Sequence, residues 1–157
     1  LKDKRVRQAF YQAIDENAIA KTVMRGAATP TQLMIAPGIN GFVKEQNTRL
    51  PYDTAAAKKL LAEAGYPNGF EIGMNCPNDR YVNDAQICQA VAAMLARIDV
   101  KVNLMVETKV TYFPKILSRE TSFYLLGWTP ASYDAHNPIF ALLMSPGPSG
   151  RGQFNLG

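Results

Sequence analysis

The chain has 157 residues and a net charge of +4, and 47% of its residues are hydrophobic while 19% are charged. This length and composition suit one compact domain with a single core and exclude a low-complexity chain. Lys and Arg are spread along the sequence rather than concentrated on one basic face with aromatic residues, which argues against nucleic-acid binding. No apolar run approaches the roughly 20 residues that a membrane-spanning helix needs.

Helix signals fill the first part of the chain. Apolar residues at helical spacing predict a helix over residues 3–14. Asp15 is a natural N-cap for a second helix, and Gly26 provides its stop. Residues 27–52 lack periodicity and are rich in Pro and Gly, so we expect an extended surface connection with at most one short strand.

The segment YDTAAAKKLLAEAGYPNGF, from Tyr52 to Phe70, predicts a third helix that ends sharply before a strand. The carboxylate of Asp53 can accept from the free N–H groups of the first turn. Gly65 supplies the left-handed residue that ends helices, and Pro67 prevents continuation. Alternating apolar residues then predict a strand over Phe70–Asn75.

Further helices and strands alternate after a loop at residues 76–83. Thr111 is expected to cap a short helix that carries Pro114 in its first turn. Between the loop and this helix, alternation over residues 100–106 predicts a half-exposed strand. That strand follows a long helix, which is predicted by an apolar stripe of Ile87, Val91, Met94, Leu95 and Ile98.

The last part of the chain contains one more predicted strand and one more helix. The run Phe123–Trp128 is apolar and bounded by turn signals, which favours a strand covered on both faces. A loop at residues 129–137 leads to a short helix over Pro138–Met144. Strands that alternate with helices through short links predict right-handed crossovers and a mainly parallel sheet.

Ligands of such sheets bind outside the carboxyl ends of the strands. This rule selects three loops as the candidate site, at residues 76–83, 107–111 and 129–137.

Four segments of the chain carry a resemblance to a known family: RVRQAFYQAIDENAIAKTVMRGAATP (Arg5–Pro30), YDTAAAKKLLAEAGYPNGF (Tyr52–Phe70), RYVNDAQICQAVAAMLARIDVKVNL (Arg80–Leu104) and FYLLGWTPASYDAHNPIF (Phe123–Phe140). In this order they resemble the family 5 solute-binding proteins of ABC importers, which include oligopeptide, dipeptide and nickel binders. The resemblance implies an α/β fold, a three-layer lobe with a mainly parallel sheet, periplasmic-binding-protein-like (type II). It also implies that residues 1–157 are one lobe of a larger two-lobed protein, with residues 145–157 as the connection toward the other lobe.

The same resemblance implies the substrate-binding component of an ABC importer. Such a protein is expected to be a monomer in the periplasm or another extracytoplasmic compartment. It binds peptides or a related small solute in the cleft between its lobes and delivers them to a membrane permease. The alternative is the ligand-sensing domain of a bacterial transcription regulator. Neither function needs a cofactor, and the sequence contains no enzyme motif of the nucleophile-elbow, phosphate-loop, dinucleotide or zinc-helix type.

Arg80 and Trp128 are the first two candidate ligand-binding residues. A guanidinium in the first loop can hold a carboxylate through two parallel hydrogen bonds, and the resemblance implies this role for Arg80. The alternative is a surface salt bridge. Trp128 is expected to form an aromatic wall of the pocket with its N–H free to donate, or else to be a core packing residue.

Tyr81, Tyr133 and Asp134 complete the candidate set. Either tyrosine can stack on a ligand or merely cover the surface. Peptide-binding relatives hold the peptide amine with an aspartate three residues after the tryptophan, where this chain has Ala131. Asp134 therefore replaces that aspartate, or the ligand has no amine, because a buried ammonium without a partner is costly. Asp134 can also simply cap the region of the Pro138 helix or brace its loop.

Two cysteines and one histidine remain. Cys76 and Cys88 either form a disulfide or are separate core residues, and the sequence leaves both possibilities open. Their spacing fits no zinc pattern, and His136 alone cannot complete a metal site with them, so we expect no bound metal.

Overall fold

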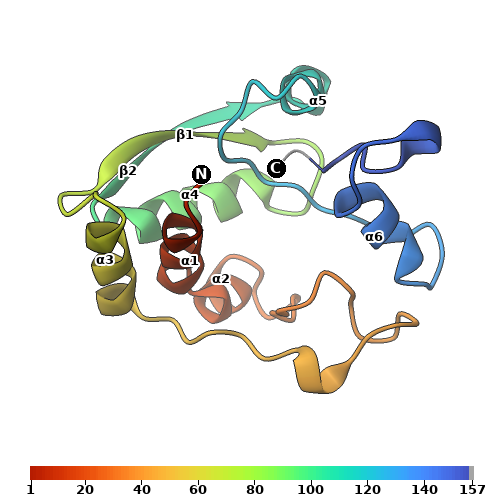
Figure 1. The fold of residues 1–157 in the computed structure, drawn as a ribbon, viewed down its shortest axis with the longest axis horizontal. Coiled ribbons are helices and arrows are strands. Elements are labelled where there is room, and N and C mark those ends of the chain that lie inside the picture. Colours follow the sequence, from red (N-terminus) through yellow and green to blue (C-terminus); the bar gives the residue numbers. More distant parts are fainter. Residues whose placement is uncertain (156–157) are drawn as a thin grey trace.

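The computed structural model of the chain describes residues 1–155. Two parallel strands and six α-helices make up its regular structure, together with two short 3₁₀ helices (Figure 1). In chain order these elements are α1 (Lys4–Ala13), α2 (Glu16–Thr22), η1 (Lys44–Gln46), α3 (Thr54–Glu63), β1 (Phe70–Pro77), α4 (Asp84–Ala96), β2 (Val100–Glu107), α5 (Lys109–Leu117), α6 (His136–Leu142) and η2 (Pro148–Gly150).

The two strands pair in parallel, from Phe70 opposite Val100 to Pro77 opposite Glu107. The connection between them is α4, which lies against one face of the strands, with α1 and α2 beyond it (Figure 1). The predicted α/β architecture and parallel pairing are therefore confirmed.

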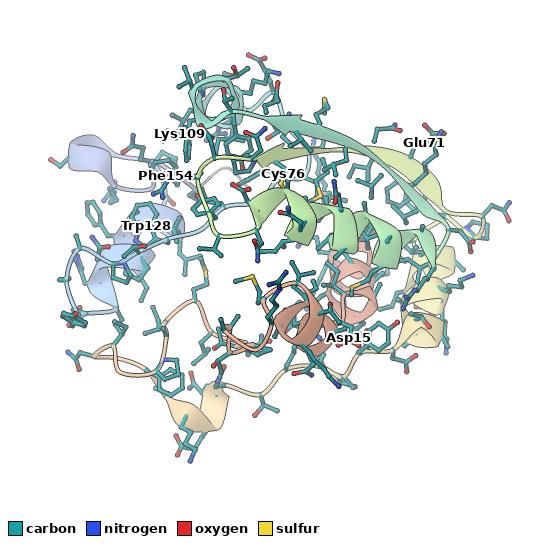
Figure 2. All side chains as sticks on the ribbon, turned by 180° about the vertical axis from the view of Figure 1, so that it is seen from behind. Asp15, Glu71, Cys76, Lys109, Trp128 and Phe154 are labelled. Carbon is teal, nitrogen blue, oxygen red and sulfur yellow. A yellow bond between two sulfur atoms is a disulfide. The ribbon has the colours of Figure 1, made fainter. Side chains whose placement is uncertain are left out.

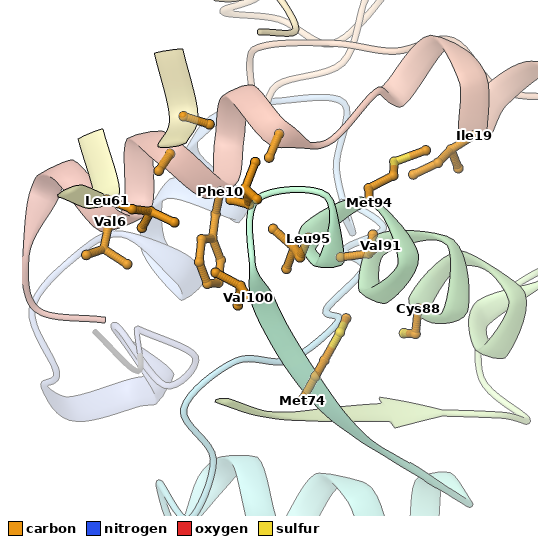
Figure 3. Close-up of a cluster of buried hydrophobic side chains, with 14 of the residues drawn as sticks. Val6, Phe10, Ile19, Leu61, Met74, Cys88, Val91, Met94, Leu95 and Val100 are labelled. Carbon is orange, nitrogen blue, oxygen red and sulfur yellow. The ribbon is translucent and has the colours of Figure 1, made fainter. Parts of the chain in front are cut away.

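The core fills the space between the sheet, α4 and α1 (Figure 3). Apolar residues at helical spacing on α1 and α4 face it, as the sequence pattern predicts. The ring of Phe10 stacks 6.0 Å from that of Phe70 and meets that of Phe123 edge-on at 5.5 Å. Fully or almost fully buried members include Ala9, Leu61, Cys88, Leu95, Ile98 and Val100.

The predicted caps of α2 and α3 and the predicted stop of α3 are confirmed, whereas α2 ends at Thr22, before the predicted stop at Gly26. The carboxylate of Asp15 accepts from the backbone N–H of Ala18, and that of Asp53 accepts from the N–H of Ala56, each at 2.9 Å. Gly65 follows α3 with a φ of +92°, which a residue with a side chain adopts only with strain. Residues 27–52 form the expected surface connection, with η1 as their one helical turn.

The predicted strand at Phe123–Trp128 is wrong. The segment is extended, but it makes only one bridge to the sheet, between Tyr124 and Asn75. The N–H of Asn75 donates to Phe123, and the N–H of Leu125 donates to Asn75. The side chains of residues 123–128 are half-buried rather than covered on both faces, and no other strand among residues 1–155 pairs with the outer edge of the segment.

Two helix starts also differ from the prediction. Helix α5 begins at Lys109 instead of after Thr111, so Pro114 lies in its second turn. Helix α6 begins at His136 instead of Pro138. In both cases a carboxylate meets the first helical N–H, Asp79 at Lys109 (2.6 Å) and Asp134 at His136 (2.8 Å). Asp79 is distant in sequence from Lys109 and so lies outside the local pattern, whereas Asp134 lies just before α6, where the sequence allowed it to act as a cap.

The tail packs against α6 as far as the structure describes it. The N–H of Gly152 donates to Phe140 at 2.8 Å, and that of Phe154 donates to Ala141 at 3.0 Å. The tail is thus attached rather than loose through residue 155. The last two residues of the predicted connection, 156 and 157, lie outside the described residues, so its direction stays a prediction.

Cys76 and Cys88 form a disulfide between the end of β1 and the first turns of α4. This settles the question that the sequence left open. Both residues are fully buried. The bridge closes the loop that carries Arg80 and Tyr81.

We expect reduction or removal of this disulfide to destabilise the protein. A cross-link between residues 12 apart lowers the conformational entropy of the unfolded chain. This raises the free energy of unfolding by about 3 kcal/mol. The free energy of unfolding, measured by urea titration with and without a reductant, should fall by about that amount on reduction. The double variant C76A/C88A should be as stable without the reductant as with it. An equal stability of the oxidised and reduced wild type would contradict this account.

Two glycines at the α3–β1 turn give a matched test of the turn geometry. A Cβ on Gly69 would lie 1.8 Å from the carbonyl oxygen of Asp99, whereas a Cβ on Gly65 would meet nothing within 4 Å. Both have a positive φ. In the same titration, Gly65→Ala should cost roughly 1–2 kcal/mol for its backbone conformation. Gly69→Ala should cost about 3 kcal/mol, because a clash adds to that cost. Equal losses would mean that the turn does not contact Asp99 as described.

Candidate ligand-binding site

Loops that follow the two strands meet because β1 and β2 end at the same level. The N–H of Asn78, after β1, donates to the carbonyl of Glu107 at the end of β2, at 3.0 Å. The carboxylate of Asp79 accepts from the N–H of Lys109 at 2.6 Å. Two of the three predicted loops are therefore joined, at the end of the sheet opposite Glu71 (Figure 2).

The first loop is folded around the carboxylate of Asp84, a residue that is only 3% exposed. This carboxylate accepts from the N–H groups of Arg80 and Tyr81, each at 3.0 Å, and from that of Ala85 at 2.9 Å. Burial by itself raises the pKa of Asp84, but these hydrogen bonds outweigh burial and hold the pKa below its usual value. The charged carboxylate thus fixes the backbone that carries Arg80 and Tyr81.

Tyr81 connects this loop to the segment that precedes the third one. Its hydroxyl donates to the carbonyl of Gly127 at 3.2 Å. A Cβ on Gly127 would lie 2.8 Å from a ring carbon of Tyr81, so a glycine is required for this close approach. Tyr81, which is predicted to contact a ligand, therefore also links its own loop to the segment at Gly127.

A cavity of about 240 Å³ lies where these segments meet. It brings together three of the five predicted site residues, Arg80, Tyr81 and Trp128. The guanidinium of Arg80 lies 5.0 Å from the centre of the Tyr81 ring. It has no ion pair or hydrogen bond to another side chain among residues 1–155. The remaining lining residues are Phe113, Leu126, Gly127, Thr129 and Phe154.

Trp128 lines the cavity, but the expectation that its N–H is free is wrong. The indole N–H donates to the side-chain oxygen of Asn137 at 3.0 Å, and the same oxygen accepts from the N–H of Ala131 at 3.2 Å. The ring of Phe154 meets the indole edge-on at 5.3 Å (Figure 2). Trp128 is thus an aromatic wall held in place by Asn137, and its N–H is not free to donate to a ligand.

Tyr133 and Asp134 do not line this cavity. The side chain of Tyr133 is in water, since the residue is 84% exposed. The carboxylate of Asp134 accepts from the side-chain N–H of Asn40 and from the backbone N–H of His136, each at 2.8 Å. The hydrogen bond from His136, followed by that from Asn40, lowers the pKa of Asp134. Its observed contacts are those of a residue that braces its loop.

Trp128 also lines a larger cavity, of about 600 Å³. It shares Leu126, Trp128 and Phe154 with the smaller one. Sequence reasoning missed Phe154, because its tail has no periodicity and nothing local places it against Trp128. The other lining residues are Thr31, Leu33, Met34, Phe123, Tyr124, Leu142 and Asn155.

Residues 1–155 contain no three His, Cys, Asp or Glu side chains placed to hold a metal ion. No helix in that range is long and apolar enough to cross a bilayer.

Known proteins resemble this chain in sequence over nearly its full length. Heme-binding protein A of Haemophilus influenzae is 33% identical over 161 aligned positions, which cover 96% of this chain and 28% of that protein. The dipeptide-binding protein of Escherichia coli is 30% identical, with 97% of this chain and 29% of that protein covered. The chain therefore spans less than a third of the length of these relatives.

Solved structures share the fold. The agropinic acid complex of AgaA from A. tumefacien R10 has a TM-score of 0.80 and 27% identity, covering 95% of this chain and 30% of that one. HbpA2 from Haemophilus parasuis has a TM-score of 0.79 and 29% identity, covering 88% and 28%. The predicted periplasmic-binding-protein-like fold of type II is thus confirmed.

The family model for bacterial extracellular solute-binding proteins, family 5 Middle, matches residues 1–150. With this match and the two relatives above, the chain belongs to family 5 of the bacterial extracellular solute-binding proteins.

Proposed function

We propose that this chain is one lobe of the substrate-binding component of an ABC importer. It binds a peptide or another small solute and presents it, within the whole protein, to a membrane permease. The observation that carries the proposal is Arg80, whose guanidinium lies over the Tyr81 ring, has no ion pair or side-chain hydrogen bond among the described residues, and lines a cavity with Tyr81 and Trp128. A cation without a carboxylate partner beside aromatic walls is suited to hold an anionic group of a solute.

The family leaves the solute open. Relatives are described as binding heme, dipeptides and glutathione, and solved complexes contain agropinic acid, mannopinic acid and the dipeptide Met-Leu. The choice among solutes therefore depends on the pocket residues rather than on the fold.

Binding is completed by a second lobe in our proposal. A solute that contacts both lobes stabilises the closed state, because the open state offers only some of those contacts. Residues 145–157 connect the lobes. The whole protein acts as a monomer in an extracytoplasmic compartment, binds no nucleic acid and catalyses no reaction, and its site needs no cofactor.

The test of this function is native mass spectrometry of the full-length protein, purified gently from its own compartment. We expect an excess mass that matches a small solute. A protein that carries no solute, and whose thermal unfolding midpoint is unmoved by any member of a broad solute library, would contradict a binding function.

Substitution of the two pocket residues should weaken binding of the solute so identified. Loss of a charge-assisted hydrogen bond is worth about 1.5–3 kcal/mol, so Arg80→Ala should lower affinity by about 10- to 100-fold in calorimetry of the full-length protein. Trp128→Ala should have an effect of similar size. Lys59→Ala removes an exposed charge outside the lining of both cavities and serves as the control. An unchanged affinity in Arg80→Ala would contradict the proposal that Arg80 contacts the solute.

A further inference from the structure

The extended segment at residues 123–128 leaves the sheet after a single bridge to β1. The N–H of Asn75 donates to the carbonyl of Phe123 at 2.9 Å, and the N–H of Leu125 donates to the carbonyl of Asn75 at 3.2 Å. In a parallel ladder the next bond would run from the N–H two residues after Asn75 to the carbonyl of Leu125. That position is Pro77, the last residue of β1, which has no N–H. The ladder therefore cannot continue along this edge.

Two tyrosine hydroxyls donate where further strand N–H groups would have donated. The hydroxyl of Tyr112 donates to the carbonyl of Leu125, the group that Pro77 cannot serve. The hydroxyl of Tyr81 donates to the carbonyl of Gly127, two residues further on, at 3.2 Å. Carbonyls two residues apart lie on the same edge of an extended segment. Beyond Pro77 this edge is thus held by side chains instead of by a strand.

Tyr112 reaches Leu125 from the neighbouring helix. It is a fully buried residue of α5, and α5 packs against β1. Burial raises the pKa of the Tyr112 hydroxyl, so the proton that makes the hydrogen bond stays in place at ordinary pH. Removal of the hydroxyl would leave the carbonyl of Leu125 without this donor, which is costly for a group with limited access to water.

We propose that Tyr112 is a positioning residue of the candidate pocket. Its hydroxyl fixes Leu125, which directly precedes three residues that line the cavity of about 240 Å³. These are Leu126, Gly127 and Trp128. Tyr112 lines neither this cavity nor the larger one, so it acts through the segment and not by touching a solute. The consequence for binding rests on the proposed function, whereas the consequence for the position of Trp128 does not.

The first test needs no solute. The full-length protein is labelled with fluorotryptophan, and the fluorine NMR resonance of Trp128 is assigned by its loss in Trp128→Phe. Tyr112→Phe removes only the hydroxyl and should displace this resonance by more than its linewidth. Tyr11→Phe is the matched control and should not displace it, because the Tyr11 hydroxyl is also buried but has no hydrogen bond within residues 1–155. An unmoved Trp128 resonance in a folded Tyr112→Phe variant would overturn the inference.

A second variant tests the exchange of donors directly. Pro77→Ala supplies the N–H that the ladder lacks, so it should offset the loss of the Tyr112 hydroxyl. In Pro77→Ala/Tyr112→Phe the Trp128 resonance should lie closer to its wild-type position than in Tyr112→Phe. If Tyr112→Phe alone fails to fold, the double variant should fold. A double variant that is displaced as far as the single one, or that also fails to fold, would contradict the inference.

The consequence for binding is measured by calorimetry with the solute that co-purifies with the wild-type protein. At a temperature where both proteins are fully folded, Tyr112→Phe should lower the affinity about 3- to 10-fold, and Tyr11→Phe less than twofold. A role confined to stability would lower the unfolding midpoint of Tyr112→Phe and leave its affinity unchanged, which would overturn the inference.

The two proposals fail in different ways. If a solute binds but neither the Trp128 resonance nor the affinity responds to Tyr112→Phe, the binding function stands and only the role of Tyr112 is wrong. If no solute of a broad library binds, the proposed function fails, and the resonance of Trp128 still tests the role of Tyr112.

Discussion

Phe70 pairs with Val100, and Pro77 pairs with Glu107, so the two parallel strands begin and end together. This register determines where a site can form, because it delivers the loops after both strands to one end of the sheet. A shift of one residue would also turn the apolar residues of β1 away from α4. The core and the candidate pocket are therefore consequences of the same pairing.

Above that end, the loop that carries Arg80 is held at three points. A disulfide closes its base, the buried carboxylate of Asp84 accepts its N–H groups, and the hydroxyl of Tyr81 bonds to Gly127. A buried carboxylate is tolerated only with such donors, so Asp84 and the loop backbone depend on each other. The backbone that carries the cation is therefore ordered before a solute binds, which removes that part of the entropy cost of binding.

Local signals in the sequence correctly predicted those features of the fold that depend only on neighbouring residues, such as helix caps. Asp15 and Asp53 cap their helices because a cap needs only the next three residues. The candidate pocket was predicted in part, since the strand-end rule selects the loops of Arg80 and Trp128.

Contacts across long stretches of chain were not predictable. Phe154 lies against Trp128 because the tail folds back, and no local pattern encodes that return. Whether another strand pairs with the outer edge of residues 123–128 likewise depends on distant parts of the chain, which a local pattern does not encode.

The central claim is that Arg80 holds an acidic group of a solute beside the wall of Trp128. A crystal structure of the full-length protein with its native solute bound tests it most directly. Our account predicts a solute carboxylate about 2.8 Å from the nitrogens of the Arg80 guanidinium, with an apolar part of the solute against Trp128. A solute held elsewhere, with the guanidinium of Arg80 turned into solvent, would contradict it.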